Sequence, residues 1–114
     1  MDRLTHYRQA LDGVVRRFGG ALQRSGGEAV ETTLITDAEH GQYGVMSIGW
    51  RADGRRAFGP VFLARIKDGK VWVEVDNTDL TLADELLAAG VPREDIVLAF
   101  QPPERRQYSD FAAA

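Results

Sequence analysis

Four charged residues between positions 53 and 76 are of the types that metal-dependent nucleases use: Asp53, Lys70, Glu74 and Asp76. Such a nuclease needs two carboxylates and a lysine that converge beside one metal-bound water. Glu74 and Asp76 are two residues apart, so a regular strand places them on one face, whereas Asp53 falls in a predicted turn at the end of the sheet. We interpret these residues as the polar outer face of a half-buried antiparallel sheet, and expect no catalytic residue among them.

A second polar group is formed by Asp37, Glu39 and His40, which lie together in a predicted turn. Their oxygen and nitrogen atoms are of the kinds that bind metals, but turns are rich in such residues for conformational reasons. His6 is the only other histidine and the chain has no cysteine, so a multi-histidine site, a cysteine-based zinc site and a disulfide are all excluded. Neither a nucleophile elbow nor a glycine-rich phosphate loop is present. We therefore expect no metal and no cofactor.

The charge balance argues against an autonomous nucleic-acid-binding protein. The chain has 14 basic and 17 acidic residues, a net charge of -3, whereas nucleic-acid-binding domains usually carry a basic surplus. Arginine accounts for all the basic residues except two lysines, which reflects either recognition of phosphate and carboxylate groups or the codon composition of the genome. The pairs Arg55-Arg56 and Arg105-Arg106 are the best candidates for contact with an acidic partner, with solvated surface as the alternative.

Three aromatic residues are candidates for a partner interface. Trp72 lies among acidic residues on a predicted strand, where it either marks an interface or packs beneath a helix or the C-terminal tail. Tyr108 and Phe111 lie near the end of the chain, and disordered segments are poor in aromatic residues. We predict that Tyr108 and Phe111 dock on the protein's own sheet or on a partner subunit.

The first element predicted is a helix. Apolar residues recur every three or four positions from Leu4 to Phe18, which is the period of one helix face. Gly19-Gly20 would end this helix, because glycine readily adopts the left-handed conformation of a C-cap. Alternatively, the helix continues to Arg24 and ends at Gly26-Gly27.

Four strands follow, over residues 30–36, 43–50, 58–66 and 70–76, joined by turns at 37–41, 53–54 and 68–69. We expect Gly69 to have a positive φ, and Pro60 to lie at a sheet edge or before the start of the third strand. Alternation predicts two shared faces, one of Phe58, Phe62, Ala64 and Ile66, and one of Val71, Val73 and Val75 opposite Trp72, Glu74 and Asp76.

A second helix is expected after the fourth strand. Thr81 and Asp84 have the spacing of a capping box, and Gly90 and Pro92 end the helix. Residues 95–100 form a short buried fifth strand, which Pro102-Pro103 breaks. These prolines favour an extended path for the C-terminal tail. The predicted fold is α+β, with helices packed on a mainly antiparallel sheet.

Several short segments, in this order and spacing, resemble the XisI family. They are residues 6–8, 49–50, 66–72, 83–86, 90–92 and 94–98, and the ending from Pro102-Pro103 through Tyr108 to residues 111–112. The resemblance extends from about Leu4 to Ala114, which predicts a single XisI-like domain over residues 1–114.

The resemblance implies a role as a controlling factor in the excision of a DNA element in cyanobacterial-type genomes. A site-specific recombinase there needs two accessory proteins, one of this family and one of the XisH type, which resembles restriction-type nucleases in fold. The family has no established catalytic motif. We therefore expect a non-catalytic accessory factor that acts with a XisH-type partner and contacts the recombinase or DNA at most indirectly; the alternative is a regulatory, antitoxin-like module that restrains the partner nuclease.

The remaining expectations concern location and assembly. The chain has neither a signal-peptide pattern nor an apolar run long enough to span a bilayer, which favours the cytoplasm and no membrane contact. An exposed sheet edge would suit a homodimer.

Overall fold

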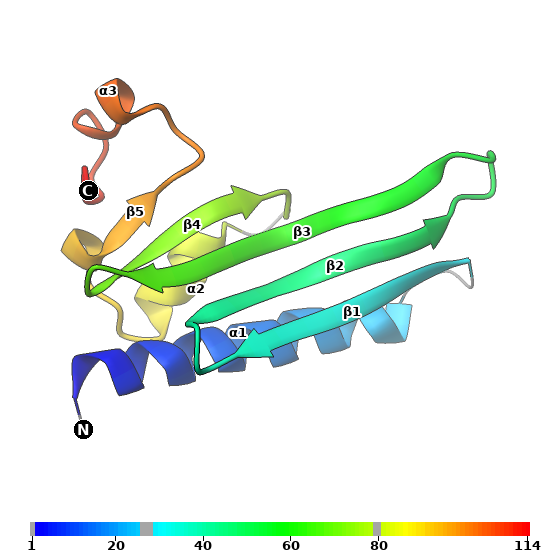
Figure 1. Cartoon of the computed structure of the whole chain (residues 1–114), viewed down its shortest axis with the longest axis horizontal. Helices are drawn as coiled ribbons and strands as arrows, with labels where there is room; N and C mark the ends of the chain where they lie inside the picture. Colours follow the sequence, from blue (N-terminus) through cyan, green and yellow to red (C-terminus); the bar gives the residue numbers. More distant parts are fainter. Residues whose placement is uncertain (1, 26–28, 79–80) are drawn as a thin grey trace.

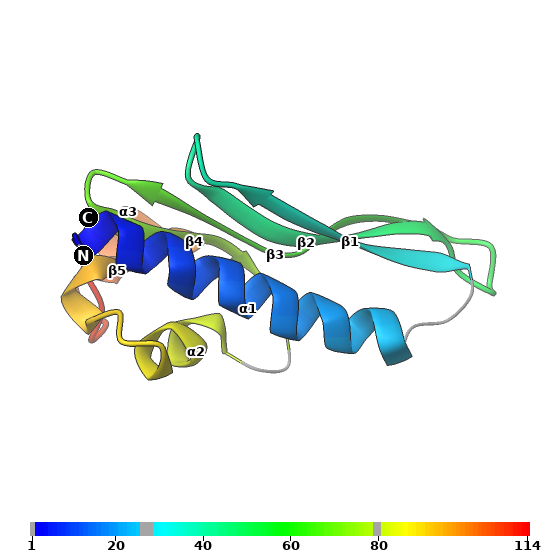
Figure 2. The same cartoon turned by 90° about the horizontal axis from the view of Figure 1, so that it is seen from below.

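A computed structural model of the chain describes residues 2–25, 29–78 and 81–114. A five-stranded sheet carries α1 and α2 on the same side (Figures 1 and 2). The elements are α1 Arg3–Ser25, β1 Val30–Asp37, β2 Gln42–Trp50, β3 Arg56–Lys67, β4 Lys70–Asp76, α2 Leu82–Ala88, the 3₁₀ helix η1 Arg93–Asp95, β5 Ile96–Leu98 and α3 Pro103–Arg106. The α+β fold predicted from the sequence is confirmed.

The long first helix passes through both glycines at 19 and 20 and reaches Ser25, so the longer of the two predicted helices is the one formed. Gly19 is buried against β1, and a Cβ atom there would lie 2.6 Å from Cδ1 of Leu34. The glycine therefore serves close packing of the helix on the sheet and does not end the helix. No helix in the described part of the chain is both long and apolar enough to cross a membrane.

The sheet has the order β1-β2-β3-β4-β5, and its first four strands form the predicted antiparallel meander. The tight turn between β3 and β4 has Asp68 at φ 53° and Gly69 at φ 76°, which confirms the positive φ expected for Gly69. The short β5 joins β4 in parallel. The core lies between the sheet and the helices and includes Tyr7 and Leu11 of α1.

The register between β2 and β3 shifts by one residue at Val61, which has no partner of its own on β2. Beyond such a bulge the alternation of side chains is reversed relative to the core. Phe62 and Ala64 are buried as predicted, but Phe58 lies on the opposite face and is 66% exposed. The predicted shared face is therefore wrong for Phe58.

A second register shift leaves Glu74 without a partner between β3 and β4. Val71 and Val73 are fully buried, whereas Val75 beyond the bulge turns to the outer face and is only partly buried. The same shift turns Asp76 towards the side that carries the helices. The prediction that the three valines share one face, with Glu74 and Asp76 on the other, is therefore only partly correct.

The start of α2 differs from the predicted capping box, because the side chain of Thr81 makes no capping hydrogen bond. Asp76 takes this role from β4: its Oδ2 accepts a hydrogen bond of 2.9 Å from the backbone N–H of Leu82. Its Oδ1 accepts from the backbone N–H and hydroxyl of Thr78. The carboxylate thus satisfies a backbone donor in the first turn of the helix, where negative charge is favoured.

The C-terminal tail is not simply extended. Pro103 occupies the start of the one-turn helix α3, where its missing N–H is not needed. The chain then returns to the sheet, and the backbone N–H of Ala112 donates to the carbonyl oxygen of Ile96 at 2.9 Å. A bridge between Ala112 and Val97 extends the sheet beyond the short β5. The tail thereby covers part of the β5 edge.

Candidate interaction surface

The charged residues considered for nuclease chemistry do not converge. Nε of Arg65 lies 2.8 Å from a carboxylate oxygen of Glu74, and Asp76 is committed to the start of α2. Lys70 donates to the backbone carbonyl of the last residue, while Asp53 lies in the loop between β2 and β3. Each group is thus held in a separate structural role.

The turn residues Asp37 and His40 are bound to each other. The Asp37 carboxylate accepts from the His40 backbone N–H at 3.0 Å, and its other oxygen lies 2.9 Å from Nδ1 of the imidazole. The His40 backbone hydrogen bond is the main cause that lowers the pKa of Asp37. Glu39 is exposed in the same turn. Over residues 2–25, 29–78 and 81–114 no group of three or more possible metal ligands is found.

The only carboxylate buried in the described part of the chain belongs to Asp95, at 8% exposure. It accepts a hydrogen bond from the hydroxyl of Tyr7 and lies 3.8 Å from the Arg3 guanidinium. Burial, followed by the hydrogen bond to Asp95, raises the pKa of Tyr7 to about 12. This arrangement ties α1 to the segment before β5.

Two of the interface residues predicted from the sequence, Trp72 and Arg106, make contacts within the protein itself. The indole N–H of Trp72 donates to the Lys67 carbonyl at 3.0 Å, and the Arg106 guanidinium lies 5.5 Å from the indole ring centroid. Arg106 also donates to the carbonyls of Ala99 at 3.1 Å and Gln101 at 3.0 Å. Of the two alternatives for Trp72, packing against the C-terminal tail is the one observed.

The tail aromatics behave differently from each other. Phe111 packs against the core, with the Arg93 guanidinium 5.4 Å from its ring centroid. Tyr108 is 83% exposed, and the neighbouring Arg105 is exposed as well. Of the two predicted alternatives, Phe111 docks on the protein's own fold. Tyr108 does not, and its docking on a partner stays a prediction.

The end of the β2–β3 hairpin carries a cluster that we call the arginine–aromatic surface, formed by Trp50, Arg56 and Phe58. The Arg56 guanidinium lies 5.2 Å from the Trp50 ring centroid and 5.6 Å from that of Phe58. Its Nη1 donates to the Gly49 carbonyl at 3.1 Å. Trp50 is 57% exposed. The guanidinium is thus held against two solvent-exposed rings.

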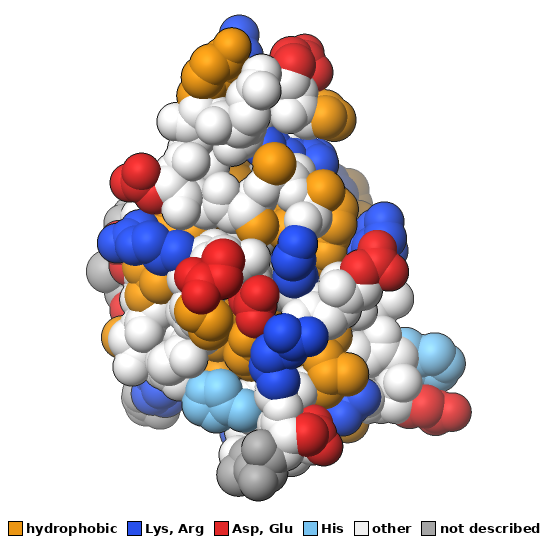
Figure 3. All heavy atoms as spheres, turned by 90° about the vertical axis from the view of Figure 1, so that its left-hand side faces the viewer, with side chains coloured by type: hydrophobic (Ala, Val, Ile, Leu, Met, Phe, Trp, Pro, Cys, Tyr) orange, Lys and Arg blue, Asp and Glu red, His pale blue; other side chains and the backbone are white. Residues whose placement is uncertain are grey.

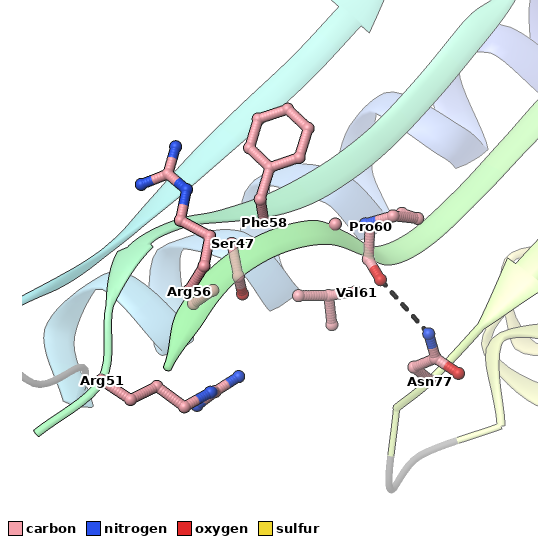
Figure 4. Close-up of a pocket in the computed structure, with 9 residues that line it drawn as sticks. Ser47, Arg51, Arg56, Phe58, Pro60, Val61 and Asn77 are labelled. Atoms are coloured by element: carbon pink, nitrogen blue, oxygen red, sulfur yellow. Dashed lines mark hydrogen bonds between the residues drawn. The ribbon is translucent and has the colours of Figure 1, made fainter. Parts of the chain in front are cut away.

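The strand register explains why these side chains meet. Trp50 pairs directly with Arg56, and Phe58 is two residues further along β3 on the same face. Figure 4 shows Arg56 and Phe58 on the same side of β3. The hairpin loop is closed by a hydrogen bond of 2.8 Å from the Arg51 N–H to the Arg55 carbonyl. A short hairpin loop therefore brings the three side chains together.

The arginine–aromatic surface borders an open groove of about 380 Å³ along the free part of β3. β4 ends opposite Phe62, so the first half of β3 has no neighbouring strand on that side. Pro60 lies there, at a sheet edge as predicted, and its carbonyl accepts from the Asn77 side chain at 3.3 Å (Figure 4). Arg51 and Arg56 line the groove at the hairpin end.

The two ends of the molecule differ in charge. Three arginines and one aspartate lie within residues 51–56, so the hairpin end carries a net charge of +2 on a chain of net charge -3. Figure 3 shows the end that carries both termini, where acidic and basic side chains are interspersed with apolar ones. The basic character of the hairpin end is therefore local.

Comparison with known proteins identifies the family. The chain matches the family described as XisI protein over residues 1–113. It belongs to the XisI family. No curated protein matches the chain.

Two solved structures show the same fold over nearly the whole XisI chain. One is a XisI-like protein from Anabaena variabilis, with 37% sequence identity and a TM-score of 0.89, which covers 97% of this chain and 99% of that one. The other is the fdxN element excision controlling factor XisI from the same organism, with 35% identity and a TM-score of 0.85, covering 99% and 100%.

Within this XisI fold, Arg56 of the sequence-predicted pair Arg55-Arg56 belongs to the arginine–aromatic surface, but neither Trp50 nor Phe58 was among the interface residues predicted from the sequence. The available signal was the spacing around Asp53-Gly54: a turn there places Trp50 opposite Arg56. Phe58 was placed on the same face as Phe62, because regular alternation takes no account of the bulge at Val61. The segment Gly49-Trp50, which contributes to the resemblance, lies at this surface.

Proposed function

We propose that this XisI-family chain is a non-catalytic accessory factor in the excision of a DNA element, and that it acts through a XisH-type, nuclease-like partner. The observation that carries the proposal is the match with the structure described as an excision controlling factor, which covers 99% of the chain at 35% identity. Such coverage includes the helices, the sheet and the hairpin end, so the proposal concerns the whole fold.

The arrangement of charged side chains supports the non-catalytic part of the proposal. A catalytic centre needs several groups that converge on one reacting atom. Here Glu74 forms an ion pair with Arg65, and Asp76 accepts a hydrogen bond from the first residue of α2, so the two carboxylates are engaged separately within the fold. The buried Asp95 is bonded to Tyr7.

The charge of the chain supports action through a protein partner. Binding to DNA depends mainly on neutralising phosphates, and a net charge of -3 opposes it. If a partner binds and cleaves the DNA, this chain does not need a basic surface that neutralises DNA phosphates.

Co-purification tests the proposal. A XisH-type protein is co-expressed with this chain, with a tag on one of the two, and the complex is measured by size-exclusion chromatography with light scattering. We expect a stable complex of defined stoichiometry. Separate elution of the two proteins at micromolar concentration would overturn the proposal. Whether the partner's nuclease is then activated or restrained is read from its cleavage rate with and without this chain.

A further inference from the structure

We propose that the arginine–aromatic surface of Trp50, Arg56 and Phe58 is where the partner protein binds, and that it takes a carboxylate flanked by an apolar side chain. The proposal rests on the proposed function, because it assigns that partner to one surface and one chemistry. The occupant is an acidic segment of the partner.

The Arg56 guanidinium is positioned before any partner arrives. It lies over both rings, and one hydrogen bond to the Gly49 carbonyl fixes its orientation. Within the described part of the chain, no carboxylate forms an ion pair with Arg56 or with Arg51. A planar guanidinium with free N–H groups binds a carboxylate through two parallel hydrogen bonds, and prior ordering lowers the entropic cost of binding.

The aromatic rings supply the apolar part of the contact. Trp50 and Phe58 are 57% and 66% exposed on the same face of the hairpin. Exposed apolar groups that lie together mark interaction sites, and tryptophan and arginine are enriched among the residues that dominate binding energy. A carboxylate bound by Arg56 would sit beside these rings, so an adjacent apolar side chain of the partner would bury them.

Charge complementarity specifies an acidic partner segment. The net charge of +2 within residues 51–56 stands on a chain of net charge -3. Arg55 is partly neutralised by Asp53, whose carboxylate lies 3.7 Å away, whereas Arg56 is not. The positive charge at the hairpin end attracts an acidic surface of the partner. The rest of the chain is acidic and repels that surface, so the partner is directed to the hairpin end.

The contacts favour a protein over a single-stranded nucleic acid. Nucleic-acid surfaces of this kind offer open aromatic faces on which successive bases stack. Here the guanidinium of Arg56 lies over both Trp50 and Phe58, so a base would have to displace it. A carboxylate instead binds at the edge of the guanidinium and leaves the stacking intact.

The test measures binding of the XisH-type protein by isothermal titration to the wild-type chain and to the variants Arg56→Glu and Phe58→Ser. Both residues are exposed, so thermal unfolding should show all variants folded. We expect each variant to raise the Kd at least about tenfold, since residues at the centre of an interface typically contribute that much. The matched control Arg16→Glu changes an exposed arginine on α1 and should change the Kd less than about twofold.

The outcomes separate the two proposals. A wild-type chain that does not bind the XisH-type protein overturns both the proposed function and this surface. Wild-type binding that both variants retain overturns only the surface. If the variants instead lose affinity for a fluorescent single-stranded oligonucleotide, or lose self-association by light scattering, the surface binds nucleic acid or a second copy and the proposal is wrong.

Discussion

The hydroxyl of Tyr7 donates a hydrogen bond to the carboxylate of Asp95, 88 residues further along the chain. Tyr7 lies on α1 and Asp95 ends η1, immediately before β5. The tyrosine is 2% exposed, so its hydroxyl is the donor that compensates for burying the carboxylate. This contact joins the first helix to the last strand.

Tyr7→Phe should therefore lower the free energy of unfolding by about 1–3 kcal/mol, because it leaves a buried carboxylate short of a donor. Chemical denaturation at pH 7 measures this loss. Tyr108→Phe is the matched control. Tyr108 is 83% exposed, so the free energy of unfolding of this variant should equal that of the wild type. Equal stability of Tyr7→Phe and the wild type would mean that the hydrogen bond contributes nothing.

The pKa of Tyr7 predicts how stability falls at high pH. The folded state holds this pKa at about 12, whereas an unfolded tyrosine titrates near 10. Below pH 10 both states keep the proton and the contribution is complete. Between pH 10 and 12 the unfolded state loses its proton first, so stability decreases as pH rises. Tyr7→Phe should show a shallower decrease over this range. Parallel curves for the two proteins would contradict the assignment.

Asp76→Ala should destabilise the protein by about 1 kcal/mol, because its carboxylate accepts the Leu82 N–H at the start of α2. Thr81→Ala is the control, since the Thr81 side chain makes no capping hydrogen bond. Thermal or denaturant unfolding compares the two variants. A larger loss for Thr81→Ala than for Asp76→Ala would restore the capping box expected from the sequence.

Arg106→Ala should lower stability by about 1–2 kcal/mol, through loss of its hydrogen bonds to the carbonyls of Ala99 and Gln101 and of its contact with Trp72. Its neighbour Arg105 is exposed, and Arg105→Ala should stay within about 0.5 kcal/mol of the wild type. Deleting residues 104–114 should cost more than Arg106→Ala, because the Ala112–Ile96 hydrogen bond is lost as well. Unchanged stability of the truncated chain would show that the tail is not docked.

The strands and turns were predictable because their signals are local. Runs of β-branched residues and the turn at Gly69 placed β4 at the residues observed. The helix end was ambiguous for a different reason. Gly19 looks like a terminator, and only its contact with Leu34 on another element shows that it serves packing.

The bulges could not be predicted, because a register shift depends on how two strands pair and not on either strand alone. The bulge at Val61 moves Phe58 to the outer face, and the bulge at Glu74 turns Asp76 towards α2. The sequence thus indicated Arg56 as a candidate interface residue, but it did not predict that the ring of Phe58 lies beside it. Without the bulge at Glu74, Asp76 is expected on the outer face, so the start of α2 was assigned to a capping box at Thr81.

Whether this chain acts through its partner is decided by DNA cleavage with three purified samples: this chain alone, the XisH-type protein alone, and the two together, each with Mg²⁺ or Mn²⁺. We expect no metal-dependent cleavage by this chain alone, weak DNA binding that is lost with added salt, and a changed cleavage rate when the partner is present. An Arg56→Glu chain should change the partner's rate far less. Metal-dependent cleavage of plasmid DNA by this chain alone, abolished in Glu74→Gln, would contradict the account.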